Sequence, residues 1–382
     1  MDDQSKPTLS LRTLAAQALG IYEPTTMGLV PPIHAATTFI RDPDNGYRFG
    51  RVYGRTDNVT VQQAENVIAA LEGADEALLF SSGMAAATTL FLALQKPTHI
   101  IASQVMYWGL RSWLQEIGRY GHSITFVDTS NLEEIRQALK PGETGLFWIE
   151  TPSNPLWTIT DIEAVAEIAH AADALLCVDS TVSTPILTRP LELGADIVMH
   201  SATKYLNGHS DVTAGALATI QGGDFWRHIK RNRASQGSVV GPFEAWLLIR
   251  GMRTLDIRVR AQAATAAFLA EKLVDHPAIS DVLYPGLKTH ASHDVAKRQM
   301  TSGFGGMLSI RLCDGEEAAI ATAARVKLWK RATSLGGVES LIEHRSSIEG
   351  NGSPCPLDLL RLSVGLEDPD DLLKDLIYAL AV

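Results

Sequence analysis

One lysine of this chain has the surroundings of a cofactor-binding lysine. Lys204 follows two hydroxyl residues, Ser201 and Thr203, just after an apolar run at 195–199 that is typical of a strand. A second apolar run, 174–178, ends in Asp179. These are the groups that a pyridoxal 5′-phosphate (PLP) site requires, because a lysine forms the Schiff base, a carboxylate keeps the pyridine nitrogen protonated and hydroxyls bind the phosphate. A surface lysine at a strand–loop junction is the alternative, and the local pattern leaves both open.

Composition excludes several classes of function. The chain has 382 residues, 46% hydrophobic and 20% charged, which allows a large core in two or three structural units. Its net charge of -10 argues against nucleic acid or an anionic membrane as the main partner. The three cysteines, Cys177, Cys313 and Cys355, form no CxxC pair, which excludes a disulfide framework and fits a reducing cytoplasm. The polar start is no secretory signal, and no apolar run approaches the ~20 residues of a membrane helix.

The elements around Lys204 alternate between strands and helices. We expect strands at 77–80, 99–102, 124–127, 146–149, 174–178 and 195–199, and helices at 65–71, 83–94, 110–120, 132–139 and 162–172. This rhythm predicts an α/β fold whose parallel strands are joined by crossover helices, with the site at their carboxyl ends. Residues 1–56 lack the rhythm and are interpreted as an arm. After residue 250, long helical stretches such as 260–274 indicate a smaller α+β domain.

A turn before the second expected helix offers a place for a phosphate. Ser82-Gly83-Met84 lies where a strand passes into a helix, and the free N–H groups of a helix start attract anions. An ordinary helix cap is the alternative. The chain has no GxGxxG after a strand, no GxxxxGK[ST] and no GxSxG, so dinucleotide, P-loop and hydrolase sites lack their key residues. His200, His209 and Asp211 lack a recognised metal-ligand spacing, and we expect no metal.

Nine motifs in a fixed order give the chain a family resemblance. It resembles the trans-sulfuration (Cys/Met metabolism) family of fold-type I PLP enzymes, which includes cystathionine β-lyase, cystathionine γ-lyase, cystathionine γ-synthase and methionine γ-lyase. The matching stretches are 53–55, 82–84, Tyr107, 151–155, 178–179, 201–211, 248–255, 334–341 and 361–368. The resemblance implies an aspartate aminotransferase-like fold: a mostly parallel central sheet flanked by helices, with a smaller C-terminal α+β domain. The implied units are an arm at 1–56, a PLP-binding domain at 57–250 and a C-terminal domain at 251–382.

The resemblance also assigns roles to residues of this chain. Lys204 holds PLP and moves protons, and Asp179 pairs with the pyridine nitrogen. Tyr107 stacks on the ring and acts near the leaving group. Tyr53 and Arg55 bind the phosphate of the neighbouring subunit, which implies a homotetramer of two catalytic dimers. The remaining implied contacts are Ser82, Gly83, Met84, Ser201 and Thr203 to the phosphate, Asn154 to the cofactor and substrate, and Ser334 and Arg361 to the substrate carboxylate.

Departures from the family pattern concern the substrate. Where γ-synthases and γ-lyases often carry glutamate this chain has Thr333, and where γ-synthases often carry aspartate it has Val52, so two distal carboxylates are missing. Other departures are Asp57 and Val59 in a loop near the entrance, Trp108 in place of a glycine, and Leu335 where one β-lyase type has tryptophan.

Three functions remain open at this stage. The first is a lyase that performs β- or γ-elimination on a cystathionine-like amino acid, breaking a carbon–sulfur or carbon–oxygen bond; a homoserine derivative such as canavanine also fits it. The second is a transferase that performs γ-replacement on an activated homoserine. The third is a PLP carrier without activity, which would not need Tyr107 and Arg361. Elimination is favoured because neither Val52 nor Thr333 can pair with the ammonium group of an incoming amino acid.

Overall fold

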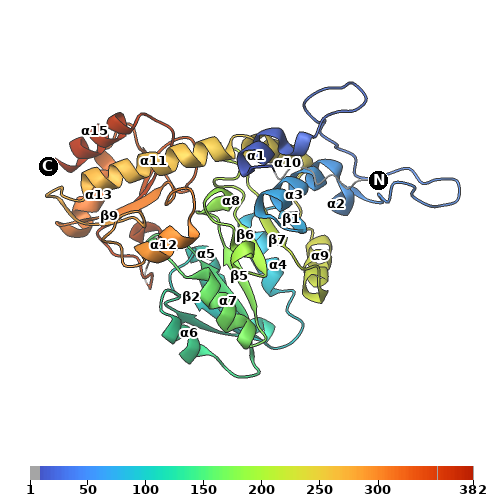
Figure 1. The fold of residues 1–382 in the computed structure, drawn as a ribbon, viewed down its shortest axis with the longest axis horizontal. Helices are drawn as coiled ribbons and strands as arrows, with labels where there is room; N and C mark the ends of the chain where they lie inside the picture. Colours follow the sequence, from blue (N-terminus) through green and yellow to red (C-terminus); the bar gives the residue numbers. More distant parts are fainter. Residues whose placement is uncertain (1–8, 351, 382) are drawn as a thin grey trace.

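The computed structural model describes residues 9–350 and 352–381, and within them the chain forms two β-sheets (Figure 1). The strands of the first sheet are β1 (Glu76–Phe80), β2 (His99–Ser103), β3 (Ser123–Val127), β4 (Thr144–Glu150), β5 (Leu175–Asp179), β6 (Ile197–His200) and β7 (Gly215–Thr219). Those of the second are β8 (Ile279–Leu283), β9 (Met307–Leu312), β10 (Lys330–Arg331), β11 (Leu341–His344) and β12 (Leu359–Ser363).

Helices make up most of the remaining regular structure. They are α1 (Leu11–Gln17), α2 (Gly54–Asp57), α3 (Val59–Glu72), α4 (Gly83–Phe91), α5 (Trp108–Gln115), α6 (Leu132–Ala138), α7 (Ile162–Ala171), α8 (Thr184–Leu187), α9 (Asp224–Gln236), α10 (Pro242–Met252), α11 (Leu255–Leu273), α12 (His293–Gln299), α13 (Gly315–Arg325), α14 (Ser346–Glu349) and α15 (Pro369–Leu380). Within the described ranges no helix is long and apolar enough to cross a membrane.

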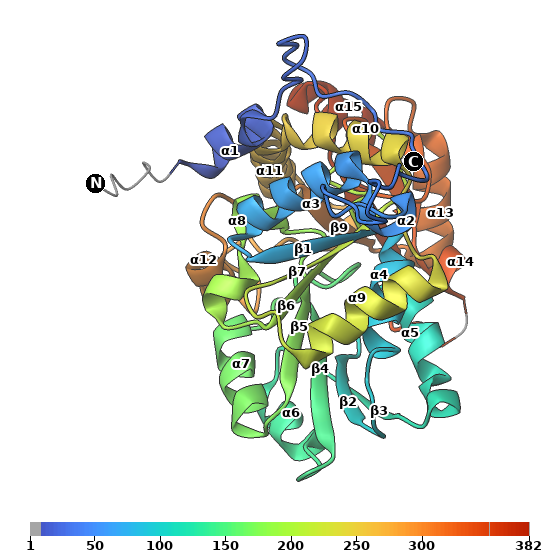
Figure 2. The same cartoon turned by 90° about the vertical axis from the view of Figure 1, so that its right-hand side faces the viewer.

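The first sheet carries helices on both faces, as strand–helix alternation predicts. Its strand order is β1-β7-β6-β5-β4-β2-β3. One face packs against α4, α5 and α9, and the other against α6 and α7 at one end and α3 and α10 at the other (Figure 2). Apart from the edge strand β3, the strands are largely buried on both faces, which is why they appear in the sequence as continuous apolar runs.

One strand of this sheet, β7, was not among the strands expected from the sequence. β7 lies between β1 and β6 and runs antiparallel to both, so β1 has no parallel neighbour. Its sequence, Gly-Ala-Leu-Ala-Thr, has a single β-branched residue, Thr219, and no aromatic residue, so it carries little of the signal that marks strands. Small residues are needed there, because a Cβ on Gly215 would lie 2.2 Å from the Ser82 carbonyl oxygen. β7 thereby places the Ser82-Gly83-Met84 turn beside the loop that carries Lys204.

The second sheet forms the smaller C-terminal unit that the sequence predicts. Its order is β10-β11-β12-β9-β8, with all pairs antiparallel except β10 with β11. Its apolar face packs against α11, α13 and α15 through residues such as Leu269, Ala319 and Leu372. The long helix α11 extends from this sheet toward the first one, as Figure 1 shows.

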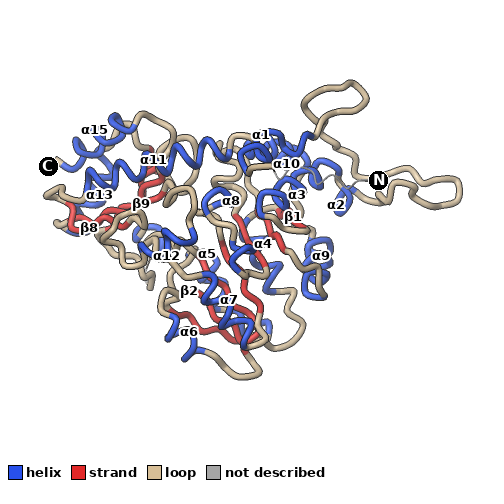
Figure 3. The backbone as a smooth tube through the Cα atoms, viewed as in Figure 1, coloured by secondary structure: helices blue, strands red, loops and turns tan. Residues whose placement is uncertain are grey.

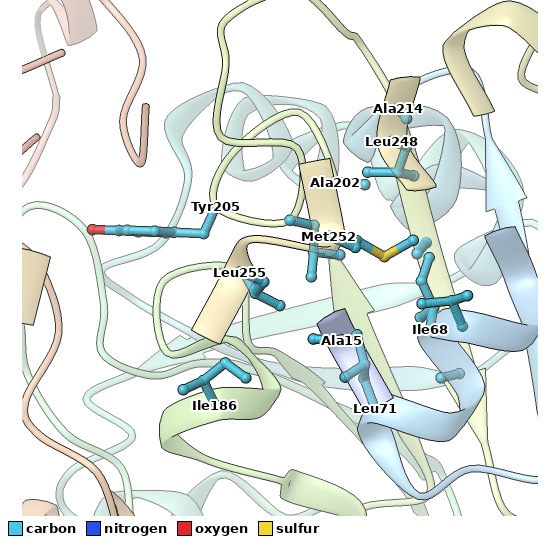
Figure 4. Packing of buried hydrophobic residues seen from close by; sticks show 14 of the residues in the cluster. Ala15, Ile68, Leu71, Ile186, Ala202, Tyr205, Ala214, Leu248, Met252 and Leu255 are labelled. Atoms are coloured by element: carbon cyan, nitrogen blue, oxygen red, sulfur yellow. The ribbon is translucent and has the colours of Figure 1, made fainter. Parts of the chain in front are cut away.

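The N-terminal segment is only partly an arm. α1 is a helix that the sequence analysis did not predict, and its Ala15 is buried among Leu71 and Leu255 (Figure 4). Seven residues are too few to show a clear helical period. The helix is therefore stabilised by its packing on α3 and α11, and not by its own sequence pattern. The following loops project from the body (Figure 3) and expose apolar side chains, with Leu29 83% and Ile40 97% exposed.

Candidate active site

A cavity of about 240 Å³ lies at the carboxyl ends of β1, β4, β5 and β6. Each of these strands ends in a turn that supplies polar groups, which is the usual place for a site in a sheet of this kind. The structure brings together at this cavity nine of the predicted site residues: Ser82, Gly83, Met84, Tyr107, Asn154, Asp179, Ser201, Thr203 and Lys204.

Lys204 is held in a turn just after β6. Its Nζ donates a hydrogen bond to Ser334 Oγ at 2.8 Å, across the boundary between the two sheets. Ser334 reaches the lysine from a backbone with φ 118°, a conformation that L residues rarely adopt and that often marks a functional position. Burial lowers the pKa of Lys204 to about 8, and the nearby Arg361 charge acts in the same direction.

This lowered pKa gives a testable pH dependence. Only the neutral amine can attack the aldehyde of PLP. The rate at which the cofactor-free protein captures PLP should therefore rise with pH through about 8 and then level off. Below that value the rate should fall roughly tenfold per pH unit. Stopped-flow absorbance would measure it. A rate that still rises steadily above pH 10 would mean that Lys204 keeps the pKa of an exposed lysine.

Asp179 ends β5 on the floor of the cavity. Its Oδ1 accepts hydrogen bonds from the Thr181 N–H at 3.0 Å and the Thr181 hydroxyl at 2.5 Å. The same hydroxyl accepts from the Ser201 N–H at 2.8 Å, which ties the carboxylate to the lysine turn. Burial raises the pKa of Asp179 and the Thr181 bonds oppose that rise. A cationic N–H reaching Oδ2 would stabilise the ionised carboxylate, and this is what a protonated pyridine nitrogen offers.

The turn before α4 has the form of a phosphate cradle. Ser82 caps the helix by accepting from the Ala85 N–H at 3.0 Å, which leaves the first N–H groups of the helix without intrahelical partners. A Cβ on Gly83 would lie 2.9 Å from the Ser201 Cβ, so only glycine lets the turn approach the lysine loop. Thr203 also lines the cavity, and its hydroxyl donates to the Ala214 carbonyl oxygen at 3.2 Å.

Glu150 is a cavity residue that the sequence analysis missed. Its Oε2 accepts from the Tyr107 N–H at 2.7 Å and its Oε1 from the Asn154 N–H at 2.8 Å, so one carboxylate positions both loops. It lies directly beside Asp179 in the sheet. Burial, and then the Asp179 charge, raise the pKa of Glu150 to about 8. The same signal that marked Asp179, an acidic residue ending an apolar run, was present here at 146–149.

Arg361 and Ser334 lie behind the cavity wall. Arg361 Nη1 donates to Asn154 Oδ1 at 3.1 Å and Nη2 donates to the Ser334 carbonyl oxygen at 2.7 Å. The side chain is 3% exposed, and burial lowers its pKa to about 10. A guanidinium next to Asn154 and Ser334 is placed to bind a carboxylate within reach of Lys204.

Two more of the predicted residues do not line the cavity of this chain. Tyr53 and Arg55 lie at the start of α2, where the Arg55 guanidinium is 5.2 Å from the Tyr53 ring centroid and Tyr53 is 46% exposed. Tyr107, in contrast, lines the cavity and is 48% exposed. Its ring lies over the following turn, since a Cβ on Gly109 would be 2.9 Å from it.

The histidines that prompted the question of a metal have other partners. His200 Nε2 lies 2.5 Å from Glu72 Oε1 in a fully buried pair, and His209 Nδ1 bonds the Asn207 carbonyl oxygen at 2.7 Å. Within the part of the chain that the structure describes, no group of three or more His, Cys, Asp and Glu is arranged to hold a metal ion.

The residues of the cavity fit PLP: a half-buried lysine of lowered pKa, a buried carboxylate and a helix start that contains glycine. The family model of the Cys/Met metabolism PLP-dependent enzymes matches residues 12–381. The chain is 43% identical over 365 residues to cystathionine gamma-synthase of Mycobacterium tuberculosis, covering 94% of this chain and 93% of that protein. It is 40% identical over 358 residues to cystathionine gamma-lyase of Bacillus subtilis, covering 91% and 93%. A crystal structure of metB from Corynebacterium glutamicum matches with a TM-score of 0.94 and 41% identity, covering 100% and 99%.

Proposed function

Because the chain belongs to the Cys/Met metabolism family of PLP-dependent enzymes, we propose that it is a lyase acting on a sulfur-containing or homoserine-type amino acid such as cystathionine. It eliminates the leaving group and yields a keto acid and ammonia. The observation that carries the proposal is the half-buried Lys204 amine, 2.8 Å from Ser334 Oγ, in a cavity backed by Arg361.

The positions of four residues around the cavity suit them to particular roles in the proposed reaction. PLP, when bound, supplies an electron sink that acidifies the α-proton of the amino acid. Arg361 binds the substrate carboxylate and so turns the α-proton toward Lys204. Lys204 Nζ, at a pKa of about 8, takes that proton and can return it at another carbon. Asp179 holds the proton of the ring nitrogen, and Tyr107 covers the cavity beside the leaving group.

Elimination is favoured over replacement by the groups at the two specificity positions. The Thr333 hydroxyl donates to Glu343 Oε1 at 2.5 Å, and so it is already engaged. Val52 is apolar and 47% exposed. Neither residue offers a carboxylate to the ammonium group of a second amino acid, which a replacement enzyme has to hold.

A γ-replacement on an activated homoserine is the second candidate. The observation in its favour is the 43% identity to a protein named cystathionine gamma-synthase. The two candidates share Lys204, Asp179 and Arg361, and they differ only in whether a second amino acid is held.

The products of L-cystathionine decide between these reactions. We expect the purified holoenzyme to release a keto acid and ammonia: pyruvate with homocysteine if the β-bond breaks, or 2-oxobutanoate with cysteine if the γ-bond breaks. The matched reaction is an acylated homoserine with cysteine, analysed for a new thioether by mass spectrometry. Efficient thioether synthesis with little keto acid would overturn the lyase proposal in favour of the second candidate.

We further propose that Tyr53 and Arg55 act in the site of a neighbouring subunit, within a homotetramer of two catalytic dimers. Their exposure and their position outside the cavity of their own chain support this, as do the exposed apolar side chains of the preceding loops. In this proposal residues 1–56 serve the neighbour, 57–250 bind PLP and 251–382 form the C-terminal domain. The three free thiols suit a reducing compartment, and we propose the cytoplasm.

Hybrid oligomers test the shared site. Arg55→Ala and Lys204→Ala protomers, each inactive alone, should regain activity when mixed under conditions of subunit exchange, because one hybrid site then has both residues. Random mixing gives a quarter of the sites both residues at most, so activity should recover to about a quarter of the wild-type value. Hybrids proven by differently tagged subunits that stay inactive would place Arg55 in the site of its own chain.

A further inference from the structure

Four charged side chains form a continuous buried chain behind the cavity. They are Glu349, Arg345, Glu343 and Arg361, and each is at most 6% exposed. Arg345 Nη2 lies 2.6 Å from Glu349 Oε1, and Arg345 Nη1 lies 2.9 Å from Glu343 Oε2. Arg361 Nη2 lies 2.6 Å from the same Glu343 oxygen. We call these four residues the buried charge chain.

Only one end of this chain faces the proposed substrate. Arg361 bonds Asn154, which lines the cavity, and Ser334, which contacts Lys204, whereas Glu349 ends α14 and accepts from the Ser353 hydroxyl. Charged groups removed from water are costly unless they are paired with good geometry. A chain of four such groups that ends on the carboxylate-binding residue therefore requires an explanation beyond the stability of the fold.

The shared oxygen of Glu343 supplies that explanation. If Glu343 paired with Arg361 alone, the two charges would cancel. A substrate carboxylate that approached Arg361 would then be repelled by the negative charge of Glu343. Arg345 contacts the same oxygen and offsets its charge, and Glu349 in turn compensates Arg345 at the far end. The positive charge of Arg361 is then left available on the cavity side.

The other oxygen of Glu343 is fixed as well. Glu343 Oε1 accepts the Thr333 hydroxyl at 2.5 Å, so both oxygens are held and the carboxylate cannot rotate toward the cavity. Arg361 Nη2, the nitrogen that contacts Glu343, also donates to the Ser334 carbonyl oxygen, and Nη1 donates to Asn154, which fixes the plane of the guanidinium.

We propose that Arg345 is a positioning residue of the carboxylate subsite: by sharing Glu343 with Arg361, it keeps Arg361 electropositive and aimed at the substrate carboxylate. The buried charge chain thereby favours the binding of amino acids with a free carboxylate over that of neutral analogues. The inference rests on the proposed function in one respect, that Arg361 binds the carboxylate, and it is independent of whether elimination or replacement follows.

L-alanine and L-alaninamide provide the test, because both carry the α-amino group, neither has a leaving group, and only alanine has a carboxylate. Binding is read from the absorbance change of the PLP holoenzyme. The double variant Arg345→Met/Glu349→Gln removes one positive and one negative charge, so the buried net charge is unchanged. We expect it to bind L-alanine about tenfold more weakly, with L-alaninamide binding changed less than about twofold.

Thr333→Val is the second variant, at an exposed position where folding is not in question. It frees Glu343 Oε1, and we expect L-alanine binding to weaken by about threefold while L-alaninamide binding is again unchanged. Glu349→Gln alone leaves Arg345 in contact with Glu343 and removes a negative charge, so L-alanine binding should not weaken in this variant. These variants keep the inference testable if the double variant does not fold.

Equal losses for L-alanine and L-alaninamide, or unchanged L-alanine binding in folded variants, would overturn the inference and leave the buried charge chain with a role in stability only. If the wild-type protein forms products from cystathionine and the variants show either of these results, only this inference is contradicted. A wild-type holoenzyme that binds neither compound would contradict both this inference and the proposed function.

Discussion

Lys204→Ala is expected to abolish the yellow colour that borohydride bleaches and to lower turnover by at least ~1,000-fold. Lys204 is the lysine among the described residues that line the cavity, so no other amine is in place to take its two roles, holding the cofactor and moving the α-proton. The variant should still fold, because a small side chain leaves space that water can enter from the cavity. Absorbance spectra and steady-state rates measure both effects.

Peptide mapping identifies the lysine directly. After borohydride reduction of the wild type, mass spectrometry should find the PLP-modified residue at 204. Lys374→Ala is the matched control, since that lysine is 76% exposed on α15, and it should retain colour and activity. A modified peptide that maps to any other lysine would refute the assignment of Lys204.

Asp179→Asn is expected to retain PLP but to lose at least ~100-fold in turnover, because a neutral amide cannot keep the ring nitrogen protonated and the electron sink weakens. The amide oxygen can still accept from Thr181, so the turn that leads to Ser201 should survive. The expected signature is therefore a fall in kcat much larger than the change in PLP affinity.

The control for this variant is Asp371→Asn, a carboxylate that is 65% exposed and lies on α15. It should leave both kcat and PLP affinity unchanged. Near-normal turnover of Asp179→Asn would mean that another group protonates the ring, and Glu150, beside Asp179 in the sheet, would be the first to examine.

The parts of the site that could be predicted are those with a local signal. Apolar runs of four or five residues indicated the strand that ends at Asp179 and the strand that precedes Lys204. The polar residues after these strands indicated where the site lies. Ser82 and Gly83 were found in the same way, from a strand that passes into a helix. The family resemblance supplied Arg361 and Ser334, which lie more than a hundred residues away from Lys204 in the sequence and have no local signal of their own.

The parts that could not be predicted depend on contacts between distant segments. β7 carries a weak strand signal, and its first residue has to be glycine because a Cβ at 215 would meet the Ser82 carbonyl oxygen, a requirement that is visible only once the two segments meet. α1 is stabilised by burial of Ala15 on α3 and α11, not by its own length. The role of Arg345 follows from sharing one oxygen of Glu343, and no spacing in the sequence indicates such a pair.

The position of β7 has a consequence for the order in which the protein matures. Phe80, which leads into the Ser82 turn, pairs with Gly215, about 135 residues later in the chain. That long loop must close before Ser82 and Ser201 can meet, and closures of this length are slow steps of folding. A nascent chain that ends shortly after Lys204 contains the lysine, the aspartate and the helix start, yet it cannot assemble them. We therefore expect cofactor capture to follow the entry of β7 into the sheet.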